Sequence, residues 1–193
     1  MANYVYNAIR FKEKDKEKFP QYLEQGNFDF NKLAKMPKEF EEMGGDHGEV
    51  EGIAKEWKDF ARDVKITPAN VDEYVEKFRN EVRENPEKYP ESSKTVNLEI
   101  KENDWGGISV PDFQYQMYRE IGKVKYGFES WLDWRSVNWG TTSEAWETKI
   151  SDEGLSFITA WDAPLPIFEK IAEFNPDIWF RVKYYDEALG VKQ

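Results

Sequence analysis

The chain has 193 residues, no cysteine and one histidine, and it carries 27 basic against 38 acidic side chains, a formal net charge of −11. This length predicts a single domain, spanning 1–193, that can fold without disulfides or a structural metal. The lack of cysteine excludes disulfides, thiolate chemistry and Cys-ligated zinc. The negative charge disfavours double-stranded nucleic acid and anionic membranes as partners.

The pattern of apolar residues also bears on location. The N-terminus lacks a basic segment followed by an apolar run, and no stretch approaches the roughly 18 apolar residues that span a bilayer. We therefore expect a cytoplasmic protein that does not bind membranes.

The N-terminal third predicts a strand, a helix and a loop. Residues 3–11 place Val5 and Ile9 on one face and Tyr4 and Tyr6 on the other, which is typical of an inner strand. Residues 14–25 show helical spacing around Pro20, where a helix would begin or kink. The segment 36–48 reads as a loop because of its glycines.

The middle of the chain predicts a helical hairpin followed by a strand. Apolar residues recur at helical spacing twice within 49–84, and Asn70 with Glu73 resembles a capping box for the second helix. Residues 95–101 alternate, with Val96, Leu98 and Ile100 inward, as in a half-exposed strand. We expect sheet-forming segments at 3–40 and 95–190 and a helical insertion at 45–90.

The C-terminal part predicts a helix from Pro111, a shorter helix over 128–137, two strands over 144–150 and 155–161, a helix from Pro166 and a strand over 178–185. With the first strand, this order is satisfied by an α+β fold, in which an antiparallel sheet carries helices on one face.

Several segments carry a resemblance to a known family. They are the opening MANYVYN, NFDFNKLAKMP at 27–37, YGFESWLDWRSVNWGTT at 126–142 and the ending ITAWDAPLPIFEKIAEFNPDIWFRVKYYDEALG at 158–190. Together they resemble the YubB-like ferredoxin-domain proteins, which are carried by plasmids and phages and have no established activity. The resemblance implies a ferredoxin-like sheet, and it leaves 45–110 unmatched, as an insertion would be.

The densest group of aromatic residues is the first candidate site. Trp131, Trp134 and Asn138 are spaced i, i+3, i+7 and share one helical face. Tryptophans with amide, hydroxyl and carboxyl groups can build a ligand pocket. The alternative is that the rings only fill the core. The candidate ligand-binding residues are Trp131, Trp134, Asn138, Trp139, Thr141, Trp161 and Asp162.

An acidic run is the second candidate. No basic residue interrupts it, and a row of carboxylates can occupy a surface that normally binds nucleic acid. The alternative is an ordinary solvated surface. The candidate partner-binding residues are Glu39, Glu41, Glu42, Asp46, Glu49 and Glu51.

No catalytic constellation is evident. His47 lies in Gly-Gly-Asp-His-Gly, and one His with one Asp falls short of a zinc site. No Gly-rich phosphate loop occurs, so we expect no cofactor and no metal. The leading hypothesis is a non-enzymatic interaction protein of a mobile genetic element, which binds a host protein, such as a defence or nucleic-acid enzyme, through its acidic surface. The alternatives are a small-ligand-binding module that uses the tryptophans and an enzyme that uses carboxylates and a divalent metal.

Overall fold

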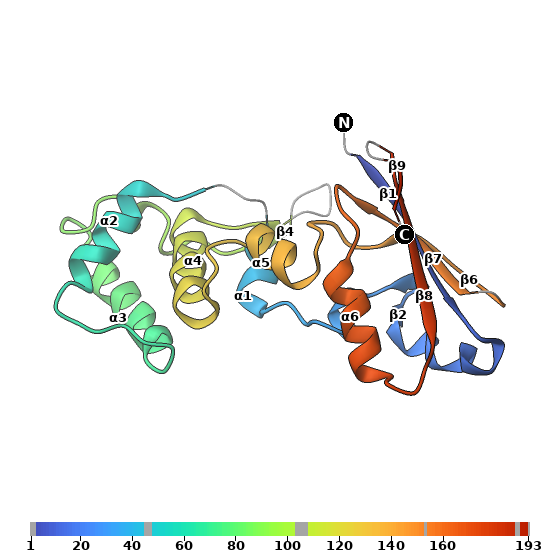
Figure 1. Cartoon of the computed structure of the whole chain (residues 1–193). Helices are drawn as coiled ribbons and strands as arrows, with labels where there is room; N and C mark the ends of the chain where they lie inside the picture. The colour runs from blue at the N-terminus through green and yellow to red at the C-terminus, as the bar shows by residue number, and fades with distance from the viewer. Residues whose placement is uncertain (1–2, 45–47, 103–107, 153, 188–189, 193) are drawn as a thin grey trace. The chain divides into compact units, whose positions relative to one another are not determined.

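A computed structural model of the chain describes residues 3–44, 48–102, 108–152, 154–187 and 190–192 (Figure 1). The chain forms two compact units. The sheet unit comprises Met1–Met36 and Leu132–Gln193, and the helical unit comprises Pro37–Trp131. The boundaries differ from those we expected: the helical unit extends beyond 45–90 and includes the segment from 95 to 131, which we had assigned to the sheet.

The sheet unit contains an antiparallel sheet with the strand order β6-β7-β1-β8-β9. The predicted antiparallel sheet and the mixture of helices and strands are thereby confirmed. The last strand was not predicted. The strands are β1 (Tyr4–Phe11), β6 (Trp146–Ser151), β7 (Gly154–Ala160), β8 (Phe180–Asp186) and β9 (Gly190–Lys192).

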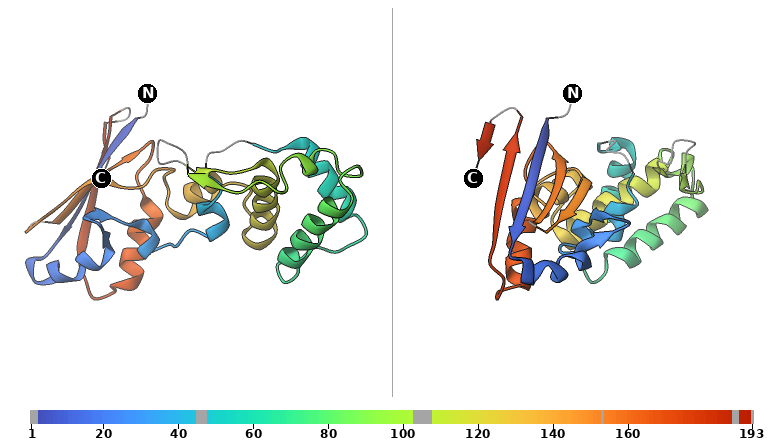
Figure 2. Two further views of the ribbon diagram at one scale, coloured as in Figure 1. Left: turned by 180° about the vertical axis from the view of Figure 1, so that it is seen from behind. Right: turned by 90° about the vertical axis from the view of Figure 1, so that its right-hand side faces the viewer.

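The central strand β1 has one buried face. Val5 and Ile9 are fully buried, and Asn7 is buried between them. The Asn7 side-chain amide donates to the Val5 oxygen and to Thr159 Oγ1 of β7, both at 3.0 Å. This face is covered by α6 (Leu165–Phe174) and by the segment that contains the short strands β2 (Leu23–Glu24) and β3 (Asn27–Phe28) (Figures 1 and 2).

The α-helix predicted over 14–25 is wrong. The segment instead forms two 3-10 helices, Glu13–Lys18 and Pro20–Tyr22, and then enters β2. Pro20 has no amide proton to donate and its ring blocks the preceding turn, so a continuous α-helix cannot pass through it. The short turns bury Phe19, which stacks on Phe11 with ring centroids 4.0 Å apart. A further 3-10 helix, Phe30–Lys32, follows β3.

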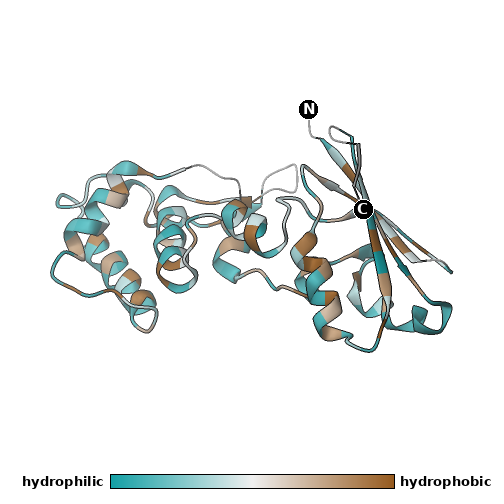
Figure 3. Ribbon diagram, in the orientation of Figure 1, coloured by the Kyte–Doolittle hydropathy of each residue, from teal (hydrophilic) through white to brown (hydrophobic). Residues whose placement is uncertain are grey.

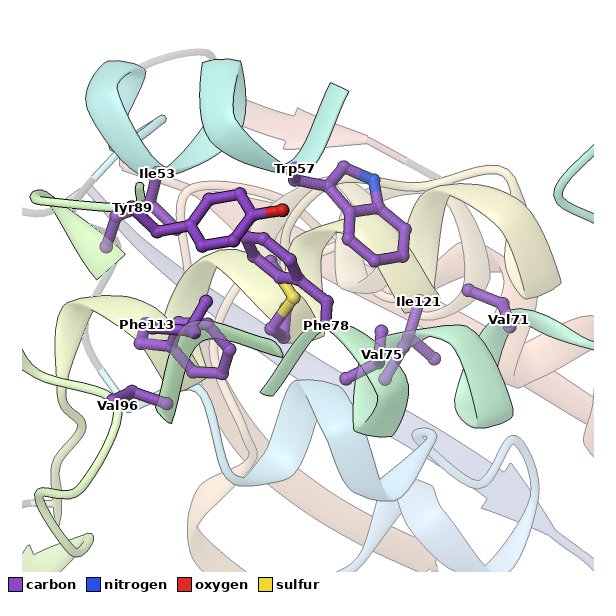
Figure 4. Packing of buried hydrophobic residues seen from close by; sticks show 11 residues of the cluster. Ile53, Trp57, Val71, Val75, Phe78, Tyr89, Val96, Phe113 and Ile121 are labelled. Atoms are coloured by element: carbon purple, nitrogen blue, oxygen red, sulfur yellow. The ribbon is translucent and has the colours of Figure 1, made fainter. Parts of the chain in front are cut away.

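The helical unit contains two helices, Glu51–Phe60 and Val71–Glu84, within the segment 49–84 where we predict a helical hairpin. Its core joins aromatic and aliphatic residues from all three longer helices, and Figure 4 shows Trp57, Phe78 and Phe113 packed together there. Each helix carries both hydrophobic and hydrophilic residues, as an amphipathic helix that buries one face does (Figure 3). The helices of this unit are α1 (Lys38–Glu41), α2 (Glu51–Phe60), α3 (Val71–Glu84) and α4 (Asp112–Tyr126), with a 3-10 helix at Ser92–Lys94. The helix α5 (Trp131–Asn138) begins at the unit boundary and matches the shorter helix that we predicted over 128–137.

The strand predicted over 95–101 is wrong. Val96 is buried in the helical core, but Leu98 and Ile100 are 59% and 39% exposed. Thr95 Oγ1 accepts a hydrogen bond from the Phe113 amide at the start of α4, which ties the segment to a helix end. Within the described residues only β4 (Lys101–Glu102) pairs here, with β5 (Ile108–Ser109). The alternation of 95–101 cannot show whether a neighbouring strand is present to pair with the whole segment.

Over the parts of the chain that the structure describes, no helix combines the length and the apolar character needed to cross a membrane.

Candidate functional site

Three members of the tryptophan group, Trp134, Trp139 and Thr141, lie in the core of the sheet unit. Trp139 is fully buried, and its ring packs edge-to-face on Trp134 and on Phe30, with centroid distances of 5.8 and 5.5 Å. Its indole Nε1 donates to the Ala34 oxygen at 2.8 Å. Thr141 is also buried. These ring faces are taken up by packing, as the alternative interpretation expected.

The other candidates of this group lie apart from that core. Trp161 is 52% exposed and has a positive φ of 72°, which is uncommon outside glycine. Its neighbour Asp162 is exposed, and the Asp162 main-chain oxygen accepts a hydrogen bond from Thr159 Oγ1 at 2.8 Å. Asn138 donates to the Trp134 oxygen within α5, and Trp131 ends the helical unit. Trp161 and Asp162 are therefore the most exposed members of the group, whereas Trp131 and Asn138 are half-buried.

Three of the acidic candidates pair with cations of their own unit. Glu39 lies 3.2 Å from Lys125 Nζ, Glu42 lies 3.1 Å from Lys38 Nζ and Glu49 lies 3.2 Å from Lys58 Nζ. Glu41 and Glu51 are exposed, and neither side-chain carboxylate has an ion-pair or hydrogen-bond partner among the described residues. Asp46 and His47 lie outside the described residues. The run is thus partly neutralised.

A hollow of about 250 Å³ lies beside two of these carboxylates. The Tyr118 hydroxyl donates to Glu42 there, and burial, followed by this hydrogen bond and then the Glu42 charge, raises the pKa of Tyr118. The Arg79 guanidinium lies 2.6 Å from Gln114 Oε1 and over the Phe113 ring. Because charges of both signs line the hollow and pair with one another, it does not present a bare row of carboxylates.

The charge of the chain is divided unequally between the units. The helical unit has 14 basic and 22 acidic side chains, a net charge of −8, whereas the sheet unit has 13 and 16, a net charge of −3. Several exposed carboxylates of the helical unit lack an ion-pair or hydrogen-bond partner within the described residues. Besides the two named above, they include Asp63, Glu84 and Glu87.

The sequence analysis missed an exposed aromatic surface on the sheet. Tyr4 and Tyr6 are each 44% exposed, Tyr185 of β8 is 42% exposed, and Trp179, just before β8, is 55% exposed. The signal was present, because Tyr4 and Tyr6 alternate with the buried residues of β1. What the sequence does not show is which face of the strand is covered.

The described residues contain no group of three or more His, Cys, Asp or Glu side chains that could hold a metal ion. Comparisons of the chain with protein-family models, with curated proteins and with solved structures found no match.

Proposed function

We propose that this chain is a non-enzymatic interaction protein of a mobile genetic element, and that its helical unit binds a host protein with a basic surface. A nucleic-acid enzyme or a defence protein has such a surface. The observation that carries the proposal is the concentration of negative charge in the helical unit, which has a net charge of −8 of the −11 in the whole chain.

The exposed, unpaired carboxylates are the groups that would meet the partner. A carboxylate that is already paired, such as Glu39 with Lys125, attracts a basic partner less strongly, because the lysine partly cancels its electric field. Unpaired ones such as Glu41, Glu51 and Glu84 keep their full charge and can steer a basic protein toward the unit. The surface we propose therefore includes only part of the run from Glu39 to Glu51 and adds exposed carboxylates further along the chain.

The origin on a plasmid or phage rests on the resemblance of the end segments to the YubB-like proteins. We also propose that the sheet has the ferredoxin-like topology of that family. It is supported by the strand order, in which β1 lies between β7 and β8 and all neighbours are antiparallel.

The test compares two variants with equal change in charge. In the first, exposed carboxylates of the helical unit are neutralised: Glu41→Gln, Glu51→Gln, Asp63→Asn and Glu84→Gln. In the matched control, exposed carboxylates of the sheet unit are neutralised: Glu13→Gln, Glu17→Gln, Glu169→Gln and Asp177→Asn.

The tagged proteins are used to capture partners from a bacterial lysate at ionic strengths of about 0.01 M and about 0.15 M, where the screening length is about 30 Å and about 8 Å. A partner identified by mass spectrometry is purified and its affinity is measured. We expect the first variant to bind roughly tenfold more weakly or worse at low salt, and the control to bind as the parent does. Equal loss in both variants, or binding insensitive to both, would contradict the proposal.

A second candidate function, binding of a small aromatic ligand, is favoured by one observation. Trp161 combines a positive φ with an exposed ring, and backbone outliers of this kind concentrate at binding sites. Tryptophan emission of the parent and of Trp161→Phe, measured across a panel of nucleosides and sugars, tests it. A ligand-induced change that is absent in Trp161→Phe is the expected result, and an unchanged spectrum throughout the panel counts against this function.

A further inference from the structure

One face of the sheet is not covered by any described element of the sheet unit. The α6 helix and the β2–β3 segment both pack on the opposite side, and Figure 2 (right) looks toward the uncovered side of β8 and β1. We call this surface the open face. It is formed by alternate residues of the strands, chiefly Tyr4, Tyr6, Trp146, Arg181, Lys183 and Tyr185.

The register brings the aromatic rings of the open face together on neighbouring strands. Tyr6 pairs with Tyr185 across β1 and β8, with ring centroids 6.2 Å apart. Tyr4 lies edge-to-face with Trp146 of β6 at 5.8 Å. The tyrosine rings remain more than 40% exposed, so their faces are available to a flat ligand.

Cations occupy the next positions of the same face. Arg181 and Lys183 precede Tyr185 at alternate residues of β8, and Lys149 of β6 pairs with Ser156 of β7. None of these three has a carboxylate partner among the described residues. Other lysines of the chain, such as Lys32, Lys125 and Lys170, are paired with carboxylates. Cations without a carboxylate partner, in a chain of net charge −11, offer an electrostatic site for an anion, and Lys183 and Arg181 stand next to each other on this face of β8.

The acidic groups near this face lie at its aromatic end. Glu187 Oε1 accepts a hydrogen bond from the Tyr6 hydroxyl at 3.3 Å, and Glu187 Oε2 accepts one from the Tyr4 amide at 3.4 Å. A polyanion would therefore place its charged groups toward Lys183 and Arg181 and its uncharged rings over the tyrosines. Alternate residues of a strand repeat at about 7 Å, a step close to that between phosphates of an extended nucleic-acid strand.

We propose that the open face binds single-stranded nucleic acid, with bases stacked on Tyr6 and Tyr185 and phosphates held by Lys183 and Arg181. Stacking on aromatic side chains together with a cationic track is how proteins bind single strands without strong sequence preference. A duplex hides its base faces within the stack, so its bases cannot stack on these rings. The inference is independent of the acidic surface of the helical unit.

The experiment is a fluorescence anisotropy titration of the full chain with fluorescein-labelled DNA of about 12 nucleotides, within the site sizes of about 4–16 nucleotides known for single-strand binding folds. The RNA of the same sequence and the annealed DNA duplex are titrated in parallel. We expect both single strands to bind and the duplex to bind much more weakly. Failure of both single strands to bind at low salt, or equal binding of the duplex, would overturn the proposal.

Variants then test the two parts of the face. Tyr6→Ala should weaken binding about 5- to 140-fold, and Tyr6→Phe, which keeps the ring, should bind as the parent does. The pair Arg181→Gln with Lys183→Gln should lower the salt-dependence slope by about 1.4, because two phosphate contacts are lost. The matched control, Lys14→Gln with Lys18→Gln, removes two exposed lysines that follow β1 and should leave the slope unchanged.

A thermal melt of each variant confirms that it folds. If Tyr6→Ala does not fold, the arginine–lysine pair decides the question, because Arg181 is exposed and Lys183 half-buried, and neither forms part of the core. A slope unchanged in that pair, or reduced equally in the lysine control, would contradict the proposed site.

Discussion

The indole Nε1 of Trp139 donates a hydrogen bond to the main-chain oxygen of Ala34 at 2.8 Å, although 105 residues separate them along the chain. Both belong to the sheet unit, whose two segments are interrupted by the whole helical unit. The bond therefore holds the end of the first segment against the start of the second. Its donor is buried, so no water can replace Ala34 as the acceptor.

Trp139 can be tested by two substitutions. Trp139→Phe keeps most of the apolar contact with Phe30 and Trp134 but leaves the Ala34 oxygen without its donor, and we expect a loss of about 1–3 kcal/mol in unfolding free energy. Trp139→Ala also opens a cavity and should cost about 3–5 kcal/mol. Urea denaturation measures both. If Trp161→Phe, an exposed tryptophan, destabilised the protein as much, the core position of Trp139 would not be the cause.

The helical glycines Gly122 and Gly52 should respond in opposite ways to alanine. A Cβ at Gly122 of α4 would lie 2.5 Å from Cε1 of the buried Phe40 and 2.9 Å from the Phe128 oxygen. Helix propensity favours alanine by about 1 kcal/mol, but overpacking costs about 1–3 kcal/mol, so Gly122→Ala should destabilise.

Gly52 of α2 is the matched control. Its added Cβ would lie 2.6 Å from Cγ and 3.1 Å from Cβ of Glu91; rotation of this half-exposed side chain removes the first contact, and a small shift of Glu91 relieves the second. We expect Gly52→Ala to be neutral or to stabilise by a few tenths of a kcal/mol. Urea midpoints of the two variants decide the matter, and equal destabilisation would show that the Glu91 side chain is as fixed as Phe40.

Two carboxylates near Lys123, Glu120 and Glu129, should contribute to the unfolding free energy with opposite dependence on pH. Burial raises the pKa of Glu120 above 4.5, so its favourable contribution is present below that pH and is lost as pH rises through the folded-state pKa. The hydrogen bond from Lys123 and its charge, followed by the charge of Arg119, lower the pKa of Glu129, so its contribution is present above 4.5 and is lost as pH falls.

The corresponding glutamine variants separate the two effects. Glu120→Gln should gain stability relative to the parent as pH rises from 4.5 toward neutral, since Gln can still accept from Gln116. Glu129→Gln should lose less than about 1 kcal/mol at neutral pH, because solvent screens a pair whose side chains are 43% (Glu129) and 54% (Lys123) exposed, and it should lose nothing in acid. Unfolding free energies measured across this pH range test both, and parallel curves would contradict the assignment.

The strands and helices of the sheet unit were largely predictable because their periodicity is strict and their ends carry breakers. The strand predicted at 155–161 is β7, one residue earlier, and Pro166 lies at the start of α6 as expected. The segment 95–101 has equally strict alternation and is not a strand. A strand needs a neighbour to pair with, and the identity of neighbours is set by the fold and not by the segment itself.

The candidate sites were predictable only in part for a similar reason. The sequence shows that Glu39 and Glu42 lie in an acidic run, but the neutralising Lys125 is 86 residues from Glu39. The alternation of β1 separates Tyr4 and Tyr6 from Val5 and Ile9, but it does not show which face α6 covers. Charge pairing and the choice of covered face are tertiary properties, and both decide what a partner can reach.

The helical unit should fold and bind on its own as the fragment 37–131. Its core residues, among them Ile53, Phe78 and Phe113, all lie inside this range, and so do the partly buried residues packed against them. We expect cooperative urea unfolding with a slope of about 1–3 kcal/mol per molar, as for small two-state domains. A fragment that is unfolded by circular dichroism would show that the core depends on the rest of the chain.

The same fragment separates the two binding proposals. It retains the unpaired carboxylates Glu41, Glu51 and Glu84 but lacks Tyr6, Tyr185 and the cations of β8. A folded fragment should therefore bind the basic protein partner as the full chain does and should not bind the single-stranded oligonucleotide. Oligonucleotide binding by the fragment would rule out the open face as the site, and loss of partner binding in a folded fragment would place the partner surface outside the helical unit.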